Sequence, residues 1–540
     1  MPQWKTMCLL IKRISTILIL ALVANVYSLN GQKISKEEYK DKLKGFWLGG
    51  CIANWTGLPT ENRRTDFRFF TDDDFGPGKY DYVLDQDPWG ADDDTDIEYV
   101  YQHAIESNDQ YKLTGEQISE AWQNHIGLPK LWVSNLSALG QMQNGAIPPA
   151  TSLPENNPMW DMIDAQLTTE IFGALAPARP DVALDIAHLP IRTTAYLHSE
   201  WASEFYVIMH SLAAVVNQSL SRKDQLIWLA EQARKRIPDW SYIADMYDFV
   251  KTAYEANPDK DNWEKTRDQV AQRYQHTVTA GYKYKYPWDS GINFAASMVS
   301  LFYGEGDYKK TIRIGCMCGW DSDNPTSTWG GLLGLLYGYE GLQSHFNKSD
   351  FSDGYYIERS RYNMPIPLDN FSDMAEGGLG IIDDIVVGAM GGSIEGDNWI
   401  IPAMKSDIIA AAVPEINVPW LTIEDSDPRW IFTGFESHKN NWNASGATLA
   451  FGYENCKAEI TFTGMAVQYY AYRSPKGGKV TITLDGVSYG DFSLENHHTH
   501  GQHYVKIFEK LGLSSGTHTL IIQGDEEATE KTIDMLSIIE

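Results

Sequence analysis

The chain has 540 residues and a formal net charge of −28, and 43% of its residues are hydrophobic and 12% aromatic. The length exceeds what one ordinary core accommodates, and the composition excludes a disordered chain, so we expect two or three packed domains. The negative charge argues against binding to nucleic acid or anionic lipid and leaves metal cations and neutral ligands such as sugars as candidate partners.

The first 28 residues are typical of a secretory signal peptide. Lys5, Lys12 and Arg13 precede an apolar run that ends in small residues near Ser28. This run is short for a membrane anchor, and no later stretch is long and apolar enough to cross a bilayer. We therefore expect a bacterial protein that is secreted or periplasmic, with no membrane span once the signal is removed.

Residues 29–400 are predicted to form an all-α domain. In "IEYVYQHAI", which begins at Ile97, apolar residues recur at helical spacing. The same spacing recurs near 203–217, 224–235, 262–274 and 291–303. Strand-like alternation is scarce in this part of the chain.

Small residues line one face of two predicted helices. Gly45, Gly49 and Ala53 are spaced four residues apart in the first helix, and Gly330 and Gly334 are spaced likewise in a helix that follows Pro325. Since glycine has no side chain, such faces allow another helix backbone to approach closely.

Acidic residues gather at the ends of these helices. They are Glu61, which ends the loop after the first helix, the run Asp92, Asp93, Asp94 and Asp96, and the pair Asp321 and Asp323. Close-packed helices would bring these carboxylates together, and oxygen ligands without His or Cys favour Mg²⁺, Mn²⁺ or Ca²⁺. The alternative is that each run is a helix cap with extra solvated acid.

Two other features of this region are interpreted as structural. The acidic run at 71–74 has no helix after it and is predicted to be a surface turn. Cys316 and Cys318 have no second Cys/His pair at zinc-finger spacing, so we expect buried structural thiols.

The residue pattern changes near residue 400 from helical spacing to strand-like alternation. Residues 401–427 are predicted to be a linker, and residues 428–540 a β-sandwich of short strands. In "KVTITLDG" apolar and polar residues alternate from Lys479 to Leu484, and Asp485-Gly486 then predicts a hairpin turn.

The helical motifs resemble those of the ADP-ribosylglycohydrolase family, which includes the glycohydrolase that reactivates dinitrogenase reductase. The resemblance covers about 40–345 and rests on three ordered motifs. The matching residues are Gly45, Gly49, Gly57, Pro59 and Glu61 in the first, Asp93-Asp94-Thr95 in the second, and Gly319, Asp321 and Asp323 in the third.

The resemblance implies an all-α catalytic domain that holds two divalent cations, with Mg²⁺ expected and Mn²⁺ or Ca²⁺ as alternatives, and that hydrolyses a bond at an anomeric carbon. The implied metal ligands are Asp92, Asp93, Asp94, Asp321 and Asp323. Glu61 matches a glutamate at the entrance of the metal site. We expect Glu61, Asp93 and Asp323 to act in catalysis, with carboxylates transferring protons.

The sequence also departs from the family pattern. Asp92 replaces a Thr, Asn54 an Asp, Trp320 a Gly, and Asn324 a Thr or Ser. A glycine-containing loop that holds the ADP-ribose end in the family has its best counterpart at Asp164-Ala165-Gln166. Losing these glycines removes close backbone approach to a diphosphate. The residues expected to contact substrate are Asn54, Asp164, Glu170, Trp320 and Asn324; for Asp164 and Glu170 the alternative is hydrogen bonding within helices.

The C-terminal region resembles galactose-binding-like modules of secreted glycosidases in "YRSPKGGKVTITLDG" and "LGLSSGTHTLIIQGD". Its aromatic residues Trp442, Tyr469, Tyr470 and Tyr472 are interpreted as sugar-stacking or core residues. The sequence thus predicts a secreted, metal-dependent glycoside hydrolase with a carbohydrate substrate. The alternatives are an ADP-ribosyl-acceptor hydrolase and a non-catalytic sugar-binding protein with a degenerate site.

Overall fold

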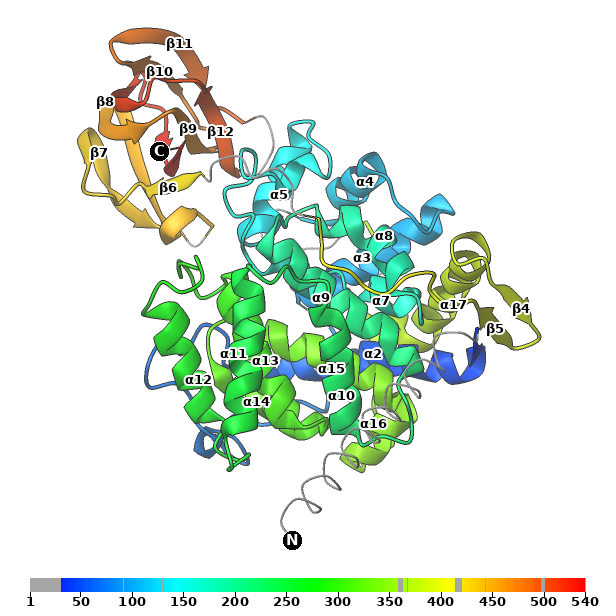
Figure 1. The fold of residues 1–540 in the computed structure, drawn as a ribbon. Helices are drawn as coiled ribbons and strands as arrows, with labels where there is room; N and C mark the ends of the chain where they lie inside the picture. The colour runs from blue at the N-terminus through cyan, green and yellow to red at the C-terminus, as the bar shows by residue number, and fades with distance from the viewer. Residues whose placement is uncertain are drawn as a thin grey trace, which may run out of the picture.

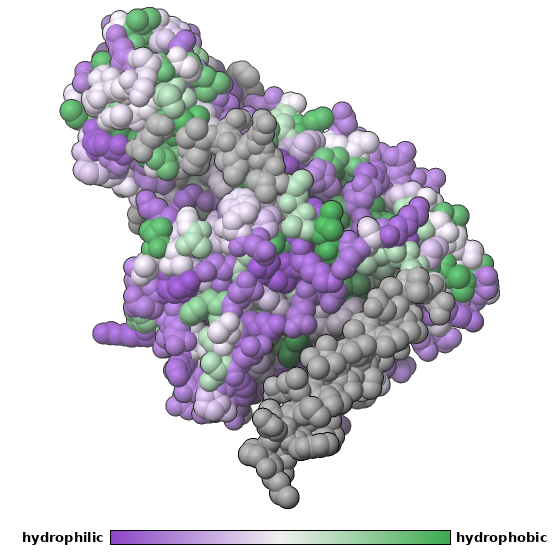
Figure 2. Space-filling model, viewed as in Figure 1, coloured by the Kyte–Doolittle hydropathy of each residue, from purple (hydrophilic) through white to green (hydrophobic). Residues whose placement is uncertain are grey.

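A computed structural model describes residues 31–90, 92–127, 131–357, 363–366, 368–412, 420–441, 443–496 and 501–539. The predicted signal peptide and Trp442 lie outside the described residues. In the described part of the chain, no helix has both the length and the apolar character needed to span a bilayer. The face of the helical region drawn in Figure 2 has many hydrophilic residues, with hydrophobic ones scattered among them.

The first part of the chain is helical, as predicted, and a β-sheet region follows it (Figure 1). The helices are α2 (Lys36–Gly57), α3 (Asp93–Asn108), α4 (Gly115–His125), α5 (Val133–Gln143), α6 (Asp164–Leu167), α7 (Ile171–Leu175), α8 (Pro180–Ile191), α9 (His198–Leu212), α10 (Arg222–Arg234), α11 (Tyr242–Ala256), α12 (Glu264–Val270), α13 (Ser290–Gly304), α14 (Tyr308–Cys318), α15 (Asp323–Tyr337), α16 (Tyr339–Phe346) and α17 (Phe371–Gly388). The predicted turn at 71–74 contains a short 3-10 helix, Asp72–Asp74.

Helices α2 and α15 cross at the centre of the helical region, and their glycines touch (Figure 1). A Cβ atom added to Gly45 would lie 2.3 Å from the carbonyl oxygen of Gly334, and one added to Gly49 would lie 2.3 Å from that of Gly330. Since real Cβ atoms do not come so close to backbone atoms, only glycine allows this approach. The predicted small-residue contact is confirmed.

Short strands flank the helices in two places. β1 (Gln32–Ser35), β5 (Asn398–Ile401) and β4 (Ser393–Glu395) form one antiparallel sheet, and β2 (Gly354–Tyr356) pairs with β3 (Leu368–Asn370). β1 thus joins the start of the helical region to the segment that follows α17.

The β region consists of two antiparallel sheets around one core. One sheet has the order β11-β10-β13-β8-β14, with β7 also paired to β8, and the other has the order β12-β9-β15-β6. The strands are β6 (Leu421–Glu424), β7 (Trp430–Asn440), β8 (Thr448–Gly464), β9 (Ala466–Arg473), β10 (Lys479–Leu484), β11 (Val487–Ser493), β12 (Gln502–Lys510), β13 (Gly516–Gly524), β14 (Lys531–Ile533) and β15 (Met535–Ile539).

Local sequence signals of this region are confirmed. Leu484 pairs with Val487, and Asp485 and Gly486 both have positive φ, at 52° and 78°, as a two-residue hairpin of type I′ requires. Tyr469 and Tyr470 are buried, so they pack inside the protein and are not available to stack on sugars.

The two regions are joined by specific contacts. The main-chain oxygen of Glu155 accepts hydrogen bonds from Gln468, Tyr470 and Lys506 at 2.9–3.2 Å. Tyr504 of β12 is buried in the hydrophobic core of the helical region and has a φ of 52°, in the left-handed region that bulky side chains rarely adopt. β12 therefore contributes a buried side chain to the helical core, while the β region keeps its own core.

Replacing Tyr504 by Ala is expected to destabilise the whole protein by about 3 kcal/mol, because it empties a large buried site in the helical core. Chemical denaturation followed by tryptophan fluorescence measures the loss. Tyr489→Ala is the matched control, since Tyr489 is 37% exposed in the same β region. Equal losses in the two variants would contradict the docking role of Tyr504.

Candidate active site

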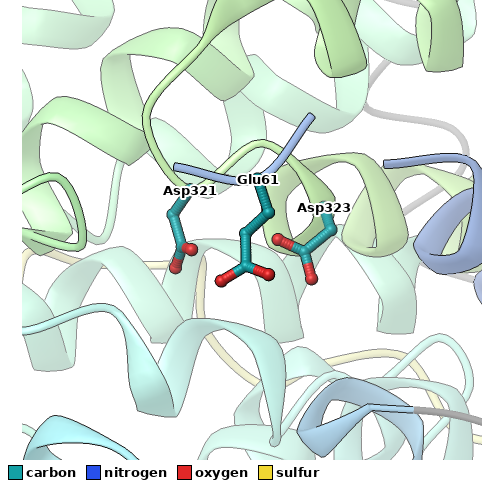
Figure 3. Close-up of side chains that lie close together, drawn as sticks. All are labelled: Glu61, Asp321 and Asp323. Atoms are coloured by element: carbon teal, nitrogen blue, oxygen red, sulfur yellow. The ribbon is translucent and has the colours of Figure 1, made fainter. Parts of the chain in front are cut away.

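Two helix ends converge on one acidic cluster, and the start of α3 lies beside it. Glu61 follows the C-terminal end of α2, and Asp321 and Asp323 lie at the start of α15. One carboxylate oxygen from each lies within 4.8 Å of the others, and Glu61 lies between the two aspartates in Figure 3. The glycine contact explains this closeness, because a Cβ atom on Gly57 would lie 2.5 Å from the Cα atom of Asp323.

The acidic run before α3 joins this cluster through Asn54. The amide nitrogen of Asn54 donates to Asp94 at 2.6 Å and also lies 3.4 Å from an acceptor oxygen of Asp323. Asp92 caps α3 by accepting the backbone N–H of Asp93 at 2.9 Å. The runs that lie far apart in the sequence are therefore brought together in the fold, as predicted.

Burial and mutual repulsion govern the charges of the cluster. Desolvation by burial raises the pKa of Asp94, Asp321 and Asp323 well above the usual range, and neighbouring carboxylates raise each further. For Asp321 and Asp323 the largest repulsion comes from Glu61. A cation placed among these groups would reverse this cost and keep them ionised.

The cluster fits divalent cations. Buried acceptor oxygens around it have no hydrogen-bond donor within the described residues, and they are Asn54 Oδ1, Asp94 Oδ1, Asp323 Oδ1 and Asn324 Oδ1. Buried polar atoms normally have partners, and oxygen atoms of this kind are the ligands that Mg²⁺, Mn²⁺ and Ca²⁺ prefer. Cys316 and Cys318 are buried, as predicted, and burial raises the pKa of both thiols, which keeps them protonated and unsuited to metal ligation.

Asn324 and Asn293 hold Asp321 in place. The amide of Asn324 donates to the Asp321 carboxylate, and the side-chain oxygen of Asn293 accepts the Asp321 backbone N–H at 3.2 Å. Asn293 lies outside the motifs from which the site residues were predicted. A polar residue inside the apolar stretch "GINFAASMV" is the signal that could have identified it.

Trp320 anchors the loop that carries Glu61. Its indole nitrogen donates to Gln275 at 3.0 Å, its ring packs on Phe69 at 4.7 Å between centroids, and its backbone oxygen accepts the N–H of Asn62. The ring is fully buried, so a sugar could stack on it only if the loop moved. Its position indicates a positioning role in place of the predicted substrate contact.

Asp164 caps a helix beside the cluster. Its carboxylate accepts the hydroxyl of Ser134 and the backbone N–H groups of Ser134 and Asn135 at the start of α5. Burial raises its pKa to about 6 although these hydrogen bonds lower it, and its charge reaches Asp321. These contacts agree with the alternative interpretation of Asp164, in which it makes hydrogen bonds to helices and does not contact substrate.

Glu170 lies behind the cluster in a buried acidic pair. It accepts the hydroxyl of Thr328 in α15. Burial and then the charge of Glu170 raise the pKa of Glu98, a residue that no sequence motif indicated and that accepts the N–H of Ile171. Burial raises the pKa of Glu170 to about 7. Glu170 thus supports α15 from inside the protein.

Replacing Glu170 by Gln is expected to stabilise the protein increasingly as the pH rises. Below its usual pKa of 4.5 the carboxyl is protonated in both states, and between there and about 7 only the unfolded chain ionises, so wild-type stability falls. The glutamine avoids this loss, which reaches roughly 3 kcal/mol above pH 7.

Urea denaturation of both proteins at pH 5 and pH 8 measures this difference. Glu120→Gln, an exposed position on α4, is the control and should show no such trend. A stability difference between wild type and Glu170→Gln that does not change with pH would contradict the buried charge.

Comparison with known proteins gives one decisive match. A profile of the ADP-ribosylglycohydrolase family matches residues 35–359. A search of curated proteins found no match. Among solved structures, an "ADP-ribosylglycohydrolase-related protein complex" is 14% identical, with a TM-score of 0.38 over 64% of this chain and 98% of the other.

Two other solved structures match about a quarter of the chain or less. The catalytic domain of a GH87 alpha-1,3-glucanase in complex with nigerose is 18% identical over 23% of this chain and 28% of that one, with a TM-score of 0.19. A cycloisomaltooligosaccharide glucanotransferase from Paenibacillus sp. is 14% identical over 22% and 18%, with a TM-score of 0.19. At these TM-scores the structural matches carry no argument. The family profile spans more than half of the chain and covers the whole acidic cluster, so the chain belongs to the ADP-ribosylglycohydrolase family, hydrolases of glycosidic-type bonds.

Proposed function

We propose that this hydrolase acts outside the bacterial cytoplasm and cleaves a glycosidic bond in a glycan with the help of divalent cations. The observation that carries the proposal is the cluster of carboxylates from two helix ends beside the start of α3, with buried oxygens that lack protein donors. Residues proposed to hold two cations, with Mg²⁺ preferred and Mn²⁺ or Ca²⁺ as alternatives, are Asp92, Asp93, Asp94, Asp321 and Asp323. Such cations polarise water and orient sugar hydroxyls.

Within the cluster, Glu61 is the group best suited to exchange protons with solvent. It is partly exposed, whereas Asp321 and Asp323 are buried. We assign to Glu61 the removal of a proton from the attacking water and the return of that proton to the leaving group, and to Asp93 and Asp323 the orientation of the cations and the substrate. Asn54 and Asn324 fix the positions of the carboxylates by donating amide hydrogens to Asp94 and Asp321.

The state of α5 supports a glycan over ADP-ribose as substrate. A helix N-terminus attracts phosphate through its unpaired N–H groups. Here the Asp164 carboxylate already accepts the N–H groups of Ser134 and Asn135. A diphosphate at this helix end would therefore meet a negative charge and be repelled. The net charge of −28 likewise disfavours a negatively charged substrate such as ADP-ribose.

The β region is proposed to bind carbohydrate, in keeping with its resemblance to galactose-binding-like modules. Its firm attachment to the helical core makes it a fixed wall beside the catalytic region. A secreted enzyme that acts on polymers gains from such a fixed second contact with its substrate.

The experiment is product analysis with the mature chain. A panel of glycans and an ADP-ribosylated peptide are incubated with added Mg²⁺ or with EDTA, and Asp321→Asn protein is the control. Sugar release that EDTA and Asp321→Asn both abolish would support the proposal. Release of ADP-ribose would establish the ADP-ribosyl-acceptor hydrolase in its place, and glycan binding without products would indicate the non-catalytic sugar-binding protein.

A further inference from the structure

A large cavity lies between the helical region and the β region. Its volume is about 1560 Å³, which exceeds the usual size of a pocket for one small molecule. Its lining includes residues near 153–161, 196–198 and 278–286 from the helical region and near 420–424 and 506–513 from the β region. It is distinct from the acidic cluster, none of whose carboxylates lines it.

Contacts at its edge fix the shape of the cavity. Tyr286, which lines it, donates its hydroxyl to Glu424 of β6 at 2.5 Å and also lies within hydrogen-bond distance of the Gly446 N–H. Glu155 binds the β region through its main-chain oxygen. The space is therefore a built feature of the fold, open to solvent on one side and lined by side chains of both regions.

Aromatic rings stand in the walls with part of their surface exposed. Trp160, Tyr196, Tyr284, Tyr286 and Trp420 are all partly exposed lining residues. Such side chains combine an apolar face with a polar edge, which suits a ligand that has both C–H faces and hydroxyl groups. Sugar rings have this composition.

Acidic and basic side chains are equally many in the walls, and three of the basic ones form ion pairs. Lys285 pairs with Asp161 at 2.7 Å, and Lys506 pairs with Glu509 at 3.0 Å. Arg429 is likewise paired, with Asp427. These pairs leave little net charge to attract an anion, so the lining favours a neutral ligand.

Polar atoms of the lining residues lack protein partners. They are Asp161 Oδ1, His198 Nδ1 and Glu424 Oε2, all buried in the wall. Burial lowers the pKa of His198 to about 3, so its ring is neutral and offers one donor and one acceptor. These atoms are covered by other protein atoms, so a ligand in the cavity contacts the exposed aromatic rings and reaches these atoms only if side chains shift.

We propose that this cavity binds a segment of a neutral oligosaccharide, as a subsite separate from the acidic cluster. The choice of ligand rests on the proposed function as a glycan hydrolase. The segment from Trp160 to Asp164 links the two sites, since Asp161 lines the cavity and the charge of Asp164 reaches Asp321. The cavity therefore holds a part of the oligosaccharide that lies away from the glycosidic bond that is cleaved.

The test measures binding by calorimetry to full-length mature protein that carries Asp321→Asn and so cannot cleave. The probes are neutral hexasaccharides of glucose, xylose, arabinose, mannose and galactose, with a hexagalacturonide as the anionic comparison. We expect at least one neutral probe to bind, and the combined change Trp160→Ala and Tyr284→Ala to weaken it at least tenfold. Tyr489→Ala, outside the cavity, should leave binding unchanged.

A second cavity variant tests whether weaker binding comes from the cavity and not from loss of folding. Val278 is 67% exposed at the cavity and Val278→Trp places bulk there without removing a buried group. We expect it to weaken the same probe at least tenfold while the unfolding temperature stays that of the parent. Binding of no neutral probe, a preference for the galacturonide, or unchanged affinity in both cavity variants would overturn the inference.

The outcomes also separate this inference from the proposed function. If neutral probes bind in the cavity but the unmutated enzyme releases no sugar from any glycan, the inference stands and the proposed function fails. If sugar is released but the cavity variants bind the hexasaccharides as well as the parent, the proposed function stands and the inference fails.

Discussion

Replacing Asp321 by Asn is expected to lower kcat/KM at least a thousandfold, because it removes a negative charge from the carboxylate cluster. The amide keeps the shape of the side chain and can still accept the hydrogen bond from Asn324. The fold should therefore remain intact, and the loss should be one of chemistry.

Steady-state hydrolysis of the substrate identified in the product analysis measures this effect. Asp73→Asn is the matched control, since Asp73 is an exposed member of another acidic run and should retain full activity. In EDTA the Asp321→Asn protein should be more stable than wild type at neutral pH, because one of several repelling buried carboxylates is gone. Activity above a tenth of wild type would remove Asp321 from the catalytic machinery.

Replacing Gly49 by Ala is expected to destabilise the protein by about 3 kcal/mol or more, because overpacked contacts with backbone atoms force helices apart. The new Cβ atom would lie 2.3 Å from the Gly330 oxygen and 3.1 Å from the Gly334 Cα atom. Any separation of α2 from α15 also moves Asp323 away from Glu61, so activity should fall together with stability.

Gly380→Ala is the matched control for this change. Gly380 lies within α17, and an added Cβ atom there would have no other atom within 4 Å. Alanine favours the helix by about 0.5–1 kcal/mol over glycine, so this variant should be neutral or more stable. Denaturant unfolding compares the two variants, and equal stability would refute the close contact between α2 and α15.

The main features of the site could be predicted because they depend on local signals. Glycines spaced four apart indicated that another helix backbone would approach each of these helices closely, and acidic residues at helix ends indicated where carboxylates would gather. The same holds for the Asp485-Gly486 hairpin, whose two residues tolerate positive φ. Each of these signals is contained in a few neighbouring residues.

Other features depend on contacts that no local pattern encodes. Asn54 was expected to contact substrate, and the structure has it bridging Asp94 and Asp323, which become its neighbours only in the folded chain. The pattern of α3 gives Glu98 no special role, and its interaction with Glu170 arises only in the folded chain. The insertion of Tyr504 into the helical core likewise follows from how two domains dock, which their separate sequences do not specify.

The order in which the chain acquires its site follows from the crossing of α2 and α15. Asn54 and Asp323 are 269 positions apart, so the cluster cannot assemble until almost the whole helical region has been synthesised and has closed a very long loop. Contacts of such high sequence separation form slowly. A nascent or partly folded chain therefore has scattered carboxylates and no joined cluster, and a cation held by the cluster would stabilise only the folded chain.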